Sequence, residues 1–426
     1  MTQPPIAASS QMKVKKCAPT EETIELAEIF TSKTIGAKAV PAFSESIINF
    51  CAHLSDAIGT EPNLSHDPEL AALAFWLRKK NISSLAQKDN EPKKRKTHKS
   101  PKGVVFLIPP TNVGSLFCYQ LVLSLLTGNR TLIRVSPNAP VTTITLCRLL
   151  RDLCKNPAYK EIAQSFDIFS YRHETEITAA LSQSCDLRVI WGGDETINEI
   201  RKIPLAAKAA EISFSDRFSW AAVKATSYLE ASDSEKQQLA QRLASDLMLF
   251  DQKACSSPKA FCWIGGKKDI NSATAVFWGN LTKEIGKRPA ELCIGNAVEK
   301  LDNIYTILAL VNNCRLETHS PFLSTLKLNQ PKVDTFDLTR DLHQGNGLLL
   351  EIRAKSLGGI QSLISKKDQT LSHYGFDGKE LTDFLDSCTG NCFDRIVPIG
   401  QSHIFSEIWD GYNMIDAYQR TITLSE

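Results

Sequence analysis

The chain has 426 residues, 42% of them hydrophobic and 23% charged, and its formal net charge is +2. This length and composition predict a globular protein of two or three domains with a large core. The charge gives no support for a nucleic-acid or membrane-surface role. No apolar run reaches the roughly 18 residues of a spanning helix, and residues 1–20 lack the apolar core of a signal peptide. We therefore expect a cytoplasmic protein with no nucleic-acid partner and no membrane span.

The first hundred residues are expected to precede the catalytic domains. Residues 1–20 show no periodicity and predict a disordered start, whereas residues 22–86 carry apolar residues at helical spacing. The run over 87–102 is basic and contains no apolar residue, which is typical of a solvated linker. Its alternative is a patch that attracts the phosphates of an anionic thioester carrier. Residues 1–100 are thus predicted to hold a disordered start, a helical extension and a basic linker.

From Gly103 onward, strand-like and helix-like segments alternate. Short apolar runs predict strands at 103–108, 131–135, 166–170 and 187–191, and the segments between them predict helices at 114–126, 141–153 and 174–182. Residues 211–224 are expected to form two more strands. This alternation predicts an α/β domain over 101–226, with a parallel sheet that has helices on both faces. Ligands bind to such sheets at the carboxyl ends of the strands.

A second α/β domain is predicted over residues 227–400. Its expected helices are 234–249, 271–285, 355–366 and 379–386, and its expected strands are 260–264, 348–352 and 395–399. Residues 401–426 are expected to pack back on the first domain or to form an oligomer interface.

The carboxyl ends of the first-domain strands supply the candidate ligand-binding residues, which are Pro109, Pro110, Thr111, Asn112, Arg134, Ser136, Pro137, Gly192, Gly193 and Asp194. No Gly-x-Gly-x-x-Gly follows the first strand, so the common dinucleotide fingerprint is absent. Glycines at 192 and 193 would let a backbone or a nicotinamide ring approach closely, although a plain tight turn explains them equally well.

Cys255 is the candidate nucleophile. It lies in a short polar turn, residues 250–258, between a predicted helix and a predicted strand. Such a turn can hold a thiol rigidly while leaving it accessible, and the backbone N–H groups beside it could stabilise an oxyanion. A buried structural cysteine is the alternative, since cysteine is among the most buried residue types.

The chain contains 12 cysteines and no Cys-x-x-Cys pair; the nearest approach is Cys388-x-x-x-Cys392. A metal bound there would need two more ligands, which the neighbouring sequence does not offer. We expect no metal site.

Several segments resemble the aldehyde dehydrogenase superfamily and, more closely, the LuxC-type long-chain acyl-CoA reductases. The main motif is Asp251-Gln252-Lys253-Ala254-Cys255-Ser256-Ser257-Pro258, which is similar to the reductase nucleophile signature. The likeness extends from about residue 65 to the end through Pro110-Thr111-Asn112, Gly128-Asn129, Arg134-Val135-Ser136-Pro137, Trp191-Gly192-Gly193-Asp194, Arg395-Ile396-Val397-Pro398-Ile399-Gly400 and Trp409-Asp410-Gly411-Tyr412.

The resemblance implies an aldehyde-dehydrogenase-like α/β fold, with a Rossmann-type parallel-sheet cofactor domain, a second α/β catalytic domain and an N-terminal helical extension. It implies that the Cys255 thiolate attacks a fatty acyl-CoA or an acyl carrier protein thioester and forms an acyl-enzyme. The Asn112 amide and the Cys255 backbone N–H would stabilise the oxyanion. A reduced nicotinamide seated near Gly193 would then release the aldehyde.

The resemblance also implies a cofactor and partners. Arg134 stands where the superfamily has a lysine that contacts the adenosine ribose. With Ser136 it could hold a 2′-phosphate, which favours NADPH over NADH. The other cofactor-binding candidates are Pro109, Pro110, Thr111, Pro137 and the segment from Gly192 to Asp194. The family further implies an acyl-protein synthetase or acyl carrier partner, and the superfamily's habit implies a homo-oligomer.

Two motifs depart from the superfamily pattern. Glu211 occupies the place of the hydrolytic glutamate but lacks the glycines that normally follow; if it faces Cys255, it could activate water or deprotonate the thiol. The turn Gly345-Asn346-Gly347 replaces the motif whose glutamate holds the nicotinamide ribose, and its backbone could support the cofactor instead. His343 and His373 are possible proton donors, although a core or surface histidine is the more common case.

Three other functions are compatible with parts of the sequence. The same fold could oxidise an aldehyde with NAD(P), in which case Glu211 would be required for turnover. A cysteine acyltransferase or hydrolase without nicotinamide would need a histidine paired with Cys255, and none of the eight histidines is marked by a motif. A catalytically silent scaffold would not need Cys255 at all.

Overall fold

The computed structural model describes residues 12–30, 40–62, 67–89, 97–287 and 294–425. The chain divides into two compact units: unit 1 comprises Met1–Asp216 and Phe405–Glu426, and unit 2 comprises Arg217–Ile404. Unit 1 therefore includes the N-terminal residues that the sequence set apart as an extension. Unit 2 begins after residue 216 and ends at residue 404, whereas the sequence predicted a second domain that begins after residue 226 and ends at residue 400.

Unit 1 is built on a seven-stranded sheet in the order β2-β1-β6-β5-β4-β7-β8. Five of its strands are parallel: β4 (Val104–Ile108), β5 (Arg130–Val135), β6 (Phe166–Ser170), β7 (Leu187–Trp191) and β8 (Ala210–Phe214). All residues of β4 and β7 are buried, including Arg188 of β7, as expected of strands in a sheet covered on both faces. The predicted α/β class and its parallel sheet are confirmed.

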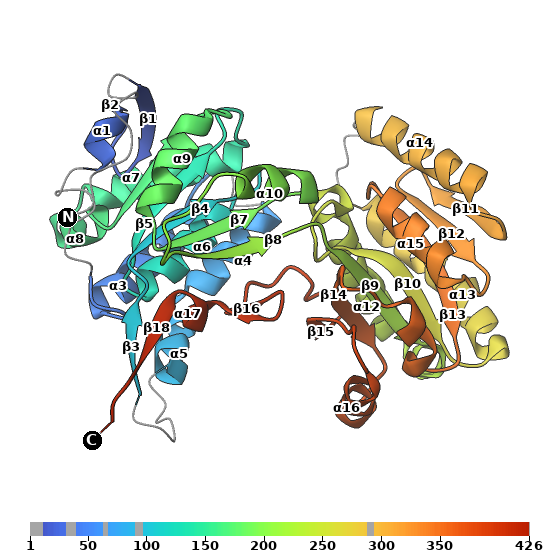
Figure 1. Cartoon of the computed structure of the whole chain (residues 1–426). Coiled ribbons are helices and arrows are strands. Elements are labelled where there is room, and N and C mark those ends of the chain that lie inside the picture. Colours follow the sequence, from blue (N-terminus) through green and yellow to red (C-terminus); the bar gives the residue numbers. More distant parts are fainter. Residues whose placement is uncertain (1–11, 31–39, 63–66, 90–96, 288–293, 426) are drawn as a thin grey trace. The chain divides into compact units, whose positions relative to one another are not determined.

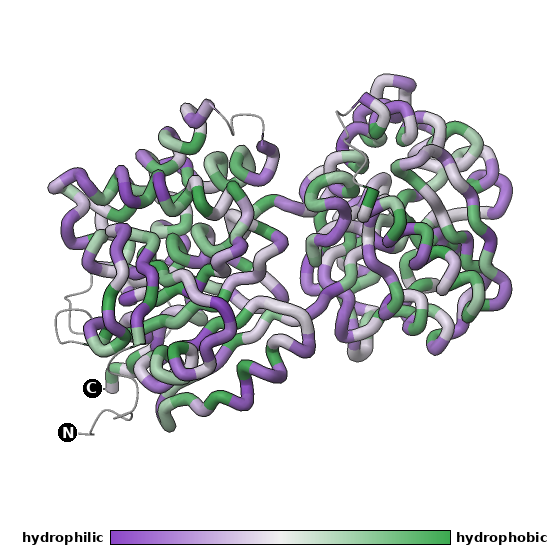
Figure 2. The backbone as a smooth tube through the Cα atoms, turned by 90° about the horizontal axis from the view of Figure 1, so that it is seen from above, coloured by the Kyte–Doolittle hydropathy of each residue, from purple (hydrophilic) through white to green (hydrophobic). Residues whose placement is uncertain are grey.

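Helices connect these strands: α6 (Leu116–Leu126), α7 (Val141–Cys154), η1 (Pro157–Tyr159), α8 (Lys160–Ala163), α9 (Thr175–Ser184) and α10 (Asp194–Arg201). Every residue of α6 is buried, whereas α7 buries only one face. Hydrophilic (purple) and hydrophobic (green) residues alternate along much of the backbone of both units in Figure 2, as expected when each element buries one face.

The N-terminal residues correct the prediction of a disordered start. Residues Lys13–Ala18 form β1 and Glu22–Glu25 form β2, and β1 pairs antiparallel with β6 at the edge of the sheet. Val14 and Ala18 are buried, and Lys16 makes a 2.7 Å ion pair with Asp167. Residues 1–11 lie outside the described part of the chain. The predicted helical extension is present as α1 (Leu26–Ile29), α3 (Glu45–Gly59), α4 (Pro68–Leu77) and α5 (Lys79–Asp89).

The basic linker is only partly a linker. Its first residues end α5, and Thr97–Pro101 form strand β3, which pairs antiparallel with the C-terminal strand β18 (Gln419–Thr423). Figure 1 shows the two strands side by side, with β18 in red. Lys99 contributes to this packing through ion pairs with Asp89 and Asp416. Residues 90–96 lie outside the description.

The rest of the C-terminal segment also packs on unit 1. It forms β16 (Ile408–Trp409), β17 (Tyr412–Asn413) and α17 (Met414–Ala417). Phe405 stacks on Tyr119 of α6 with ring centroids 4.9 Å apart, and Trp409 lies 5.9 Å from Trp191 at the end of β7. Buried aromatic contacts of this kind fix the segment against the sheet. An oligomer interface at the same residues stays a prediction.

Unit 2 contains a second seven-stranded sheet, in the order β11-β12-β13-β10-β9-β14-β15. The strands are β9 (Phe218–Lys224), β10 (Pro258–Ile264), β11 (Cys314–Ser320), β12 (Leu323–Leu328), β13 (Leu348–Ala354), β14 (Asp368–Tyr374) and β15 (Arg395–Pro398). All neighbouring strands are parallel except the edge pair β11 and β12.

The helices of unit 2 cover both faces of this sheet. They are α11 (Ala225–Glu230), α12 (Asp233–Met248), η2 (Leu249–Gln252), α13 (Lys267–Gly286), α14 (Ile294–Leu310), α15 (Val333–Leu342), η3 (Leu357–Leu363) and α16 (Gly378–Ser387). The helix predicted over 355–366 is only the short 3₁₀ segment η3. Two apolar clusters, one on each face, form the core.

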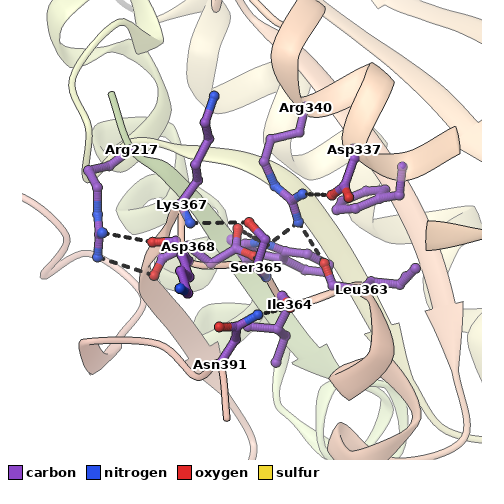
Figure 3. A network of polar contacts seen from close by, with 12 residues as sticks. Arg217, Asp337, Arg340, Leu363, Ile364, Ser365, Lys367, Asp368 and Asn391 are labelled. Atoms are coloured by element: carbon purple, nitrogen blue, oxygen red, sulfur yellow. Dashed lines mark hydrogen bonds and ion pairs between the residues drawn. The ribbon is translucent and has the colours of Figure 1, made fainter. Parts of the chain in front are cut away.

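A buried polar network fixes several of these elements to one another (Figure 3). The Asp368 carboxylate accepts hydrogen bonds from the Trp220 indole at 2.7 Å and from Arg340 at 3.0 Å. Arg340 also contacts Asp337 and the Leu363 carbonyl. Burial raises the pKa of Asp368, and the Arg340 charge opposes that rise.

Within the described residues, no helix is both long and apolar enough to cross a membrane.

Candidate active site

The turn that carries Cys255 has a strained backbone. Phe250, Asp251 and Gln252, which precede it, all adopt left-handed conformations, with φ of 57°, 52° and 61°. This conformation costs an L-residue roughly 1–2 kcal/mol, so three in succession persist only where surrounding contacts enforce them. Such enforced strain is a common feature of functional sites.

Gln252 supplies the main enforcing contacts. Its side chain is fully buried, and its amide oxygen accepts a 2.9 Å hydrogen bond from the Gly347 N–H. Its amide nitrogen donates to the carbonyls of Pro258 and Leu348, each at 2.7 Å. One buried amide therefore joins the nucleophile turn to the start of β10 and to the turn before β13. A buried group with all its polar atoms paired has little freedom to move.

The turn Gly345-Asn346-Gly347 also holds the nucleophile turn in place. The Asn346 N–H donates to the Asp251 carbonyl at 2.8 Å. A Cβ on Gly345 would lie 2.9 Å from that same oxygen, and Gly345 has φ of +89°, so a side chain there is excluded twice. We expected this turn to support the cofactor; in the structure its backbone supports the nucleophile turn.

An ion pair adds a third support. The Lys253 ammonium lies 2.7 Å from Glu299 of α14, and the same carboxylate accepts from the Asn346 side chain at 2.8 Å. These contacts lower the pKa of Glu299, with the Lys253 hydrogen bond as the main cause. Glu299 therefore stays ionised at neutral pH and binds both turns at once.

Two hydroxyl groups hold the backbone on the other side of Cys255. The Ser219 hydroxyl donates to the Cys255 carbonyl at 2.6 Å. The Ser256 hydroxyl lies 3.0 Å from His403 Nδ1, and His403 Nε2 lies 2.9 Å from the Asp246 carbonyl. Because a carbonyl only accepts, Nε2 carries the hydrogen and Nδ1 accepts from Ser256. Burial lowers the pKa of His403 to about 4, so the ring is neutral at pH 7.

His343 and His373 do not have the setting of proton donors. His343 is buried, its Nδ1 accepts from the Gly345 N–H at 3.1 Å, and its Nε2 donates to the Leu348 carbonyl at 3.0 Å. Burial lowers its pKa to about 3, so it supports the loop as a neutral ring. Burial also lowers the pKa of His373, which lies at the carboxyl end of β14.

In unit 1, several cofactor-binding candidates line one shallow, open pocket. It lies at the carboxyl ends of β4 and β5. Its lining includes Pro109, Pro110, Thr111 and Ser136 together with Thr143 of α7. This is the edge at which parallel sheets bind ligands. Asn112 and Pro137 are exposed in the same two turns.

Arg134 lies at the end of β5 and points toward the segment after β6. Its guanidinium donates to the Arg172 carbonyl, and its central carbon lies 5.3 Å from the Tyr171 ring centroid. Its Nε is buried and has no hydrogen-bond partner among the described residues. A buried unpaired donor is costly, and an anionic ligand would satisfy it.

The Gly192 to Asp194 segment forms the amino-terminal end of α10. The Gly192 N–H donates to the Phe214 carbonyl at 3.1 Å, and the Asp194 N–H donates to the Asp216 carboxylate at 3.2 Å. Gly193 has no side chain, which leaves room for the Asp216 carboxylate; a Cβ at this position would lie only 3.2 Å from it. Asp194 and Asp216 place two carboxylates at this helix end, which disfavours a phosphate there.

Glu211 does not belong to this edge of the sheet. It is the second residue of β8, near the amino end of the strand, and pairs in register with Arg188. One carboxylate oxygen accepts from Arg188 at 2.8 Å and the other from Arg201 at 2.9 Å. Both oxygens are occupied by cations, so we remove Glu211 from the candidate catalytic set.

A comparison with protein families identifies residues 80–308, which include the nucleophile turn, as a match to LuxC, the acyl-CoA reductase family. The match spans more than half of the chain. The chain belongs to the LuxC family of acyl-CoA reductases. The expected family is thereby confirmed, and with it an oxidoreductase that acts on acyl or aldehyde groups. A search of curated protein sequences gave no match.

Solved structures similar to this LuxC-family chain are aldehyde dehydrogenases. A putative aldehyde dehydrogenase from Burkholderia cenocepacia has a TM-score of 0.66 at 13% identity, covering 97% of this chain and 96% of that one. The aldehyde dehydrogenase KauB from Pseudomonas aeruginosa has a TM-score of 0.65 at 13% identity, with 98% and 94% covered. A putative methylmalonate-semialdehyde dehydrogenase from Sinorhizobium meliloti 1021, complexed with NAD, has a TM-score of 0.61 at 13% identity, with 98% and 95% covered. The aldehyde-dehydrogenase-like fold is confirmed.

No local sequence feature marks His403 as a support of the LuxC nucleophile turn, because it lies 147 residues from Ser256. We expect His403→Phe to lower kcat about tenfold with little change in KM, since the ring holds the backbone beside Cys255 and not the substrate. The alkylation of Cys255 by iodoacetamide should slow without a shift in its pH midpoint, because a neutral ring does not stabilise a thiolate.

A double-mutant cycle tests whether His403 acts through Ser256. If it does, His403→Phe combined with Ser256→Ala should be no slower than either single variant. His403→Asn, which keeps an acceptor near Ser256, should recover part of the rate. Additive losses, or a raised pH midpoint for Cys255 alkylation in His403→Phe, would contradict this role.

Proposed function

We propose that this LuxC-family enzyme reduces a long-chain fatty acyl thioester to the aldehyde, with NADPH as the reductant and an acyl-Cys255 intermediate. The observation that carries the proposal is the clamped, strained turn that ends in Cys255. The side chains of Gln252, Glu299, Ser219 and His403 hold this turn, together with the backbone of the turn 345–347. This is the arrangement expected for a nucleophile whose position controls the rate.

In the proposed reaction, the Cys255 sulfur attacks the thioester carbonyl, and collapse of the tetrahedral intermediate expels the carrier thiol. Ser219 fixes the Cys255 carbonyl and so fixes the peptide plane that follows the nucleophile. The Asn112 amide and the Cys255 backbone N–H are our candidates for stabilising the oxyanion. When bound, the nicotinamide supplies the hydride that converts the acyl group to aldehyde. Glu211 is held by two arginines and is therefore not available to activate water on the acyl-enzyme.

The residues of unit 1 fit a nicotinamide dinucleotide. The pocket beyond β4 and β5 offers an apolar proline wall and three hydroxyl groups, and the unpaired Nε of Arg134 lies at the end of β5. An arginine can hold a 2′-phosphate through charged hydrogen bonds that NADH does not need. We therefore favour NADPH over NADH.

Removal of the Arg134 charge tests the choice of cofactor. We expect Arg134→Leu to lower kcat/KM for NADPH at least tenfold while leaving that for NADH nearly unchanged, since only NADPH loses a charge-assisted contact. The measurement is the ratio of the two kcat/KM values. Ser136→Ala is the milder companion, expected to change the ratio by a few-fold. An unchanged ratio in Arg134→Leu would assign the phosphate to other residues.

Mass analysis of the acyl-enzyme tests the proposed function directly. After incubation with a long-chain acyl-CoA, tryptic digestion should place one acyl group on the peptide Ala254–Lys259, which contains no cysteine other than Cys255. If NADPH is added before digestion, the acyl group should leave Cys255 as free aldehyde, and the peptide should be recovered unmodified. An adduct that NADPH leaves in place would indicate an acyltransferase or hydrolase. No adduct with any acyl thioester would refute the proposal.

The partners are proposed on the same basis. We propose that the acyl group arrives as fatty acyl-CoA or on an acyl carrier protein, with an acyl-protein synthetase as a further donor, and that the enzyme forms a homo-oligomer. Comparing acyl-CoA with acyl carrier protein thioesters of equal chain length, at matched concentration, distinguishes the two carriers.

A further inference from the structure

Two cysteines lie side by side at the end of α16, in a part of unit 2 that the proposed reaction does not use. Cys388 follows the last residue of the helix, and its N–H donates to the Leu385 carbonyl at 3.1 Å. The Sγ atoms of Cys388 and Cys392 are 3.0 Å apart. The Cys392 thiol donates to Cys388 Sγ, and the Cys388 thiol donates to the Phe384 carbonyl at 3.4 Å.

This pair has no metal to bind. Among the described residues, no three histidine, cysteine, aspartate or glutamate side chains gather as a metal ion would require. Two thiolates alone do not complete a tetrahedral site. The chemistry left to two adjacent sulfurs is reaction with each other.

The geometry of the pair suits a disulfide bond. Two bonded sulfurs are about 2.05 Å apart, so the sulfurs need to approach by only about 1 Å. Between the cysteines, Gly390 has φ of +136°, and no atom lies within 4 Å of the position that a Cβ would take. A glycine in open space allows the intervening loop to adjust as the sulfurs approach.

The surroundings of the two cysteines keep Cys388 protonated and leave the pair accessible. Both cysteines are partly buried and pack against the apolar cluster that contains Phe384 and Phe393. Burial, with the neighbouring Cys392 as a further cause, raises the pKa of Cys388 to about 12. Cys388 is therefore a protonated thiol at neutral pH, so it must lose its proton before its sulfur can attack, because the thiolate is the nucleophile. Partial exposure leaves the pair accessible to a small oxidant.

We propose that Cys388 and Cys392 form an oxidation site at which a small disulfide closes them into an intramolecular disulfide bond. One of the two cysteines attacks one sulfur of the oxidant as its thiolate, forms a mixed disulfide and expels one thiolate. The other cysteine then loses its proton to that thiolate and attacks the sulfur of the first cysteine, which releases the second thiol. The protein dithiol is oxidised by two electrons, and the oxidant is reduced to two thiols.

The two cysteines precede, in the sequence, a segment that supports the nucleophile turn. Beyond Cys392, Arg395 of β15 donates to the carbonyls of Ser402, Gln401 and Ile404 at 2.9–3.0 Å, on both sides of His403. The disulfide would close a ring immediately before this strand. A closed ring restricts the unfolded chain more than the folded one, so the oxidised protein should melt a few degrees higher.

Peptide mapping under non-reducing conditions tests the inference without using the reductase activity. The full chain is treated with oxidised glutathione, blocked with iodoacetamide and digested with trypsin. The peptide Glu380–Arg395 contains Cys388 and Cys392 and no other cysteine. We expect it to lose two hydrogens and both alkylation sites, and dithiothreitol should restore them.

Two controls make the result specific. The peptide Leu301–Arg315 contains one cysteine, Cys314, which is also partly buried. Cys314 should remain alkylatable at the same oxidant dose. In Cys388→Ser, the remaining Cys392 should stop at the glutathione mixed disulfide. Two alkylatable thiols in the Glu380–Arg395 peptide after Cys314 has reacted, or a disulfide to another peptide, would overturn the proposal.

Discussion

The Cys255→Ala enzyme should fold normally and lose at least about 10⁴-fold in kcat/KM for acyl thioester reduction. The expected loss is large because removal of a covalent nucleophile eliminates the acyl-enzyme path and leaves only binding and oxyanion stabilisation. The measurement is NADPH oxidation with a long-chain acyl-CoA, together with aldehyde formation.

Cys314→Ala is the matched control for this variant. Cys314 is partly buried in the edge strand β11, and burial raises its pKa to about 11, so it is an unreactive thiol. Its loss should change kcat/KM less than twofold. If Cys255→Ala retained more than a few per cent of the wild-type rate while remaining folded, an acyl-Cys255 intermediate would be excluded.

The Arg340→Met protein should be destabilised by about 3–5 kcal/mol, the usual cost when one partner of a buried ion pair is removed. Arg340 and Asp368 have almost fully buried side chains 3.0 Å apart (Figure 3). Without Arg340, the Asp368 carboxylate keeps the Trp220 indole but loses its only buried charge partner in that network, and the Leu363 carbonyl loses a donor. Urea unfolding followed by tryptophan fluorescence gives the free energy of unfolding.

Two further variants make this prediction specific. Arg340→Met combined with Asp368→Asn removes the uncompensated charge and should recover a large part of the loss. Lys367→Met breaks the ion pair with Asp341, whose members are about half exposed, and should cost less than about 1 kcal/mol. Equal losses in Arg340→Met and Lys367→Met would show that burial of the pair does not set its contribution.

The elements that the sequence predicted well have a local signal. Strand β4 is a continuous apolar run between turn residues, and strands β6 and β7 are mostly apolar, which is the pattern that burial on both faces produces. Strand β1 was missed because it is a short strand with three lysines, in which only Val14 and Ala18 are buried. Segment η3 was expected to be a helix because Leu357, Ile360 and Leu363 are buried, and a spacing of three suits a 3₁₀ turn as well as an α-helix.

Some residues of the candidate site likewise have a local sequence signal, and others do not. Cys255, and the residues of the pocket beyond β4 and β5, stand in turns between regular elements and are visible in the sequence. The supports of the nucleophile turn are not, because Gln252 bonds to residues about 95 positions away. Glu211 was mistaken for a catalytic base because sequence position alone does not reveal that Arg188 and Arg201 occupy its carboxylate.

The three left-handed residues before Cys255 imply a trade between thermostability and turnover. Glycine adopts such angles without steric cost, so Asp251→Gly would relieve part of the strain. It would also enlarge the range of backbone conformations open to the turn, and with it the scatter in the direction of the sulfur. A LuxC enzyme evolved in the laboratory only for heat resistance should therefore acquire glycine here and become slower, and selection for rate should restore the bulkier residue.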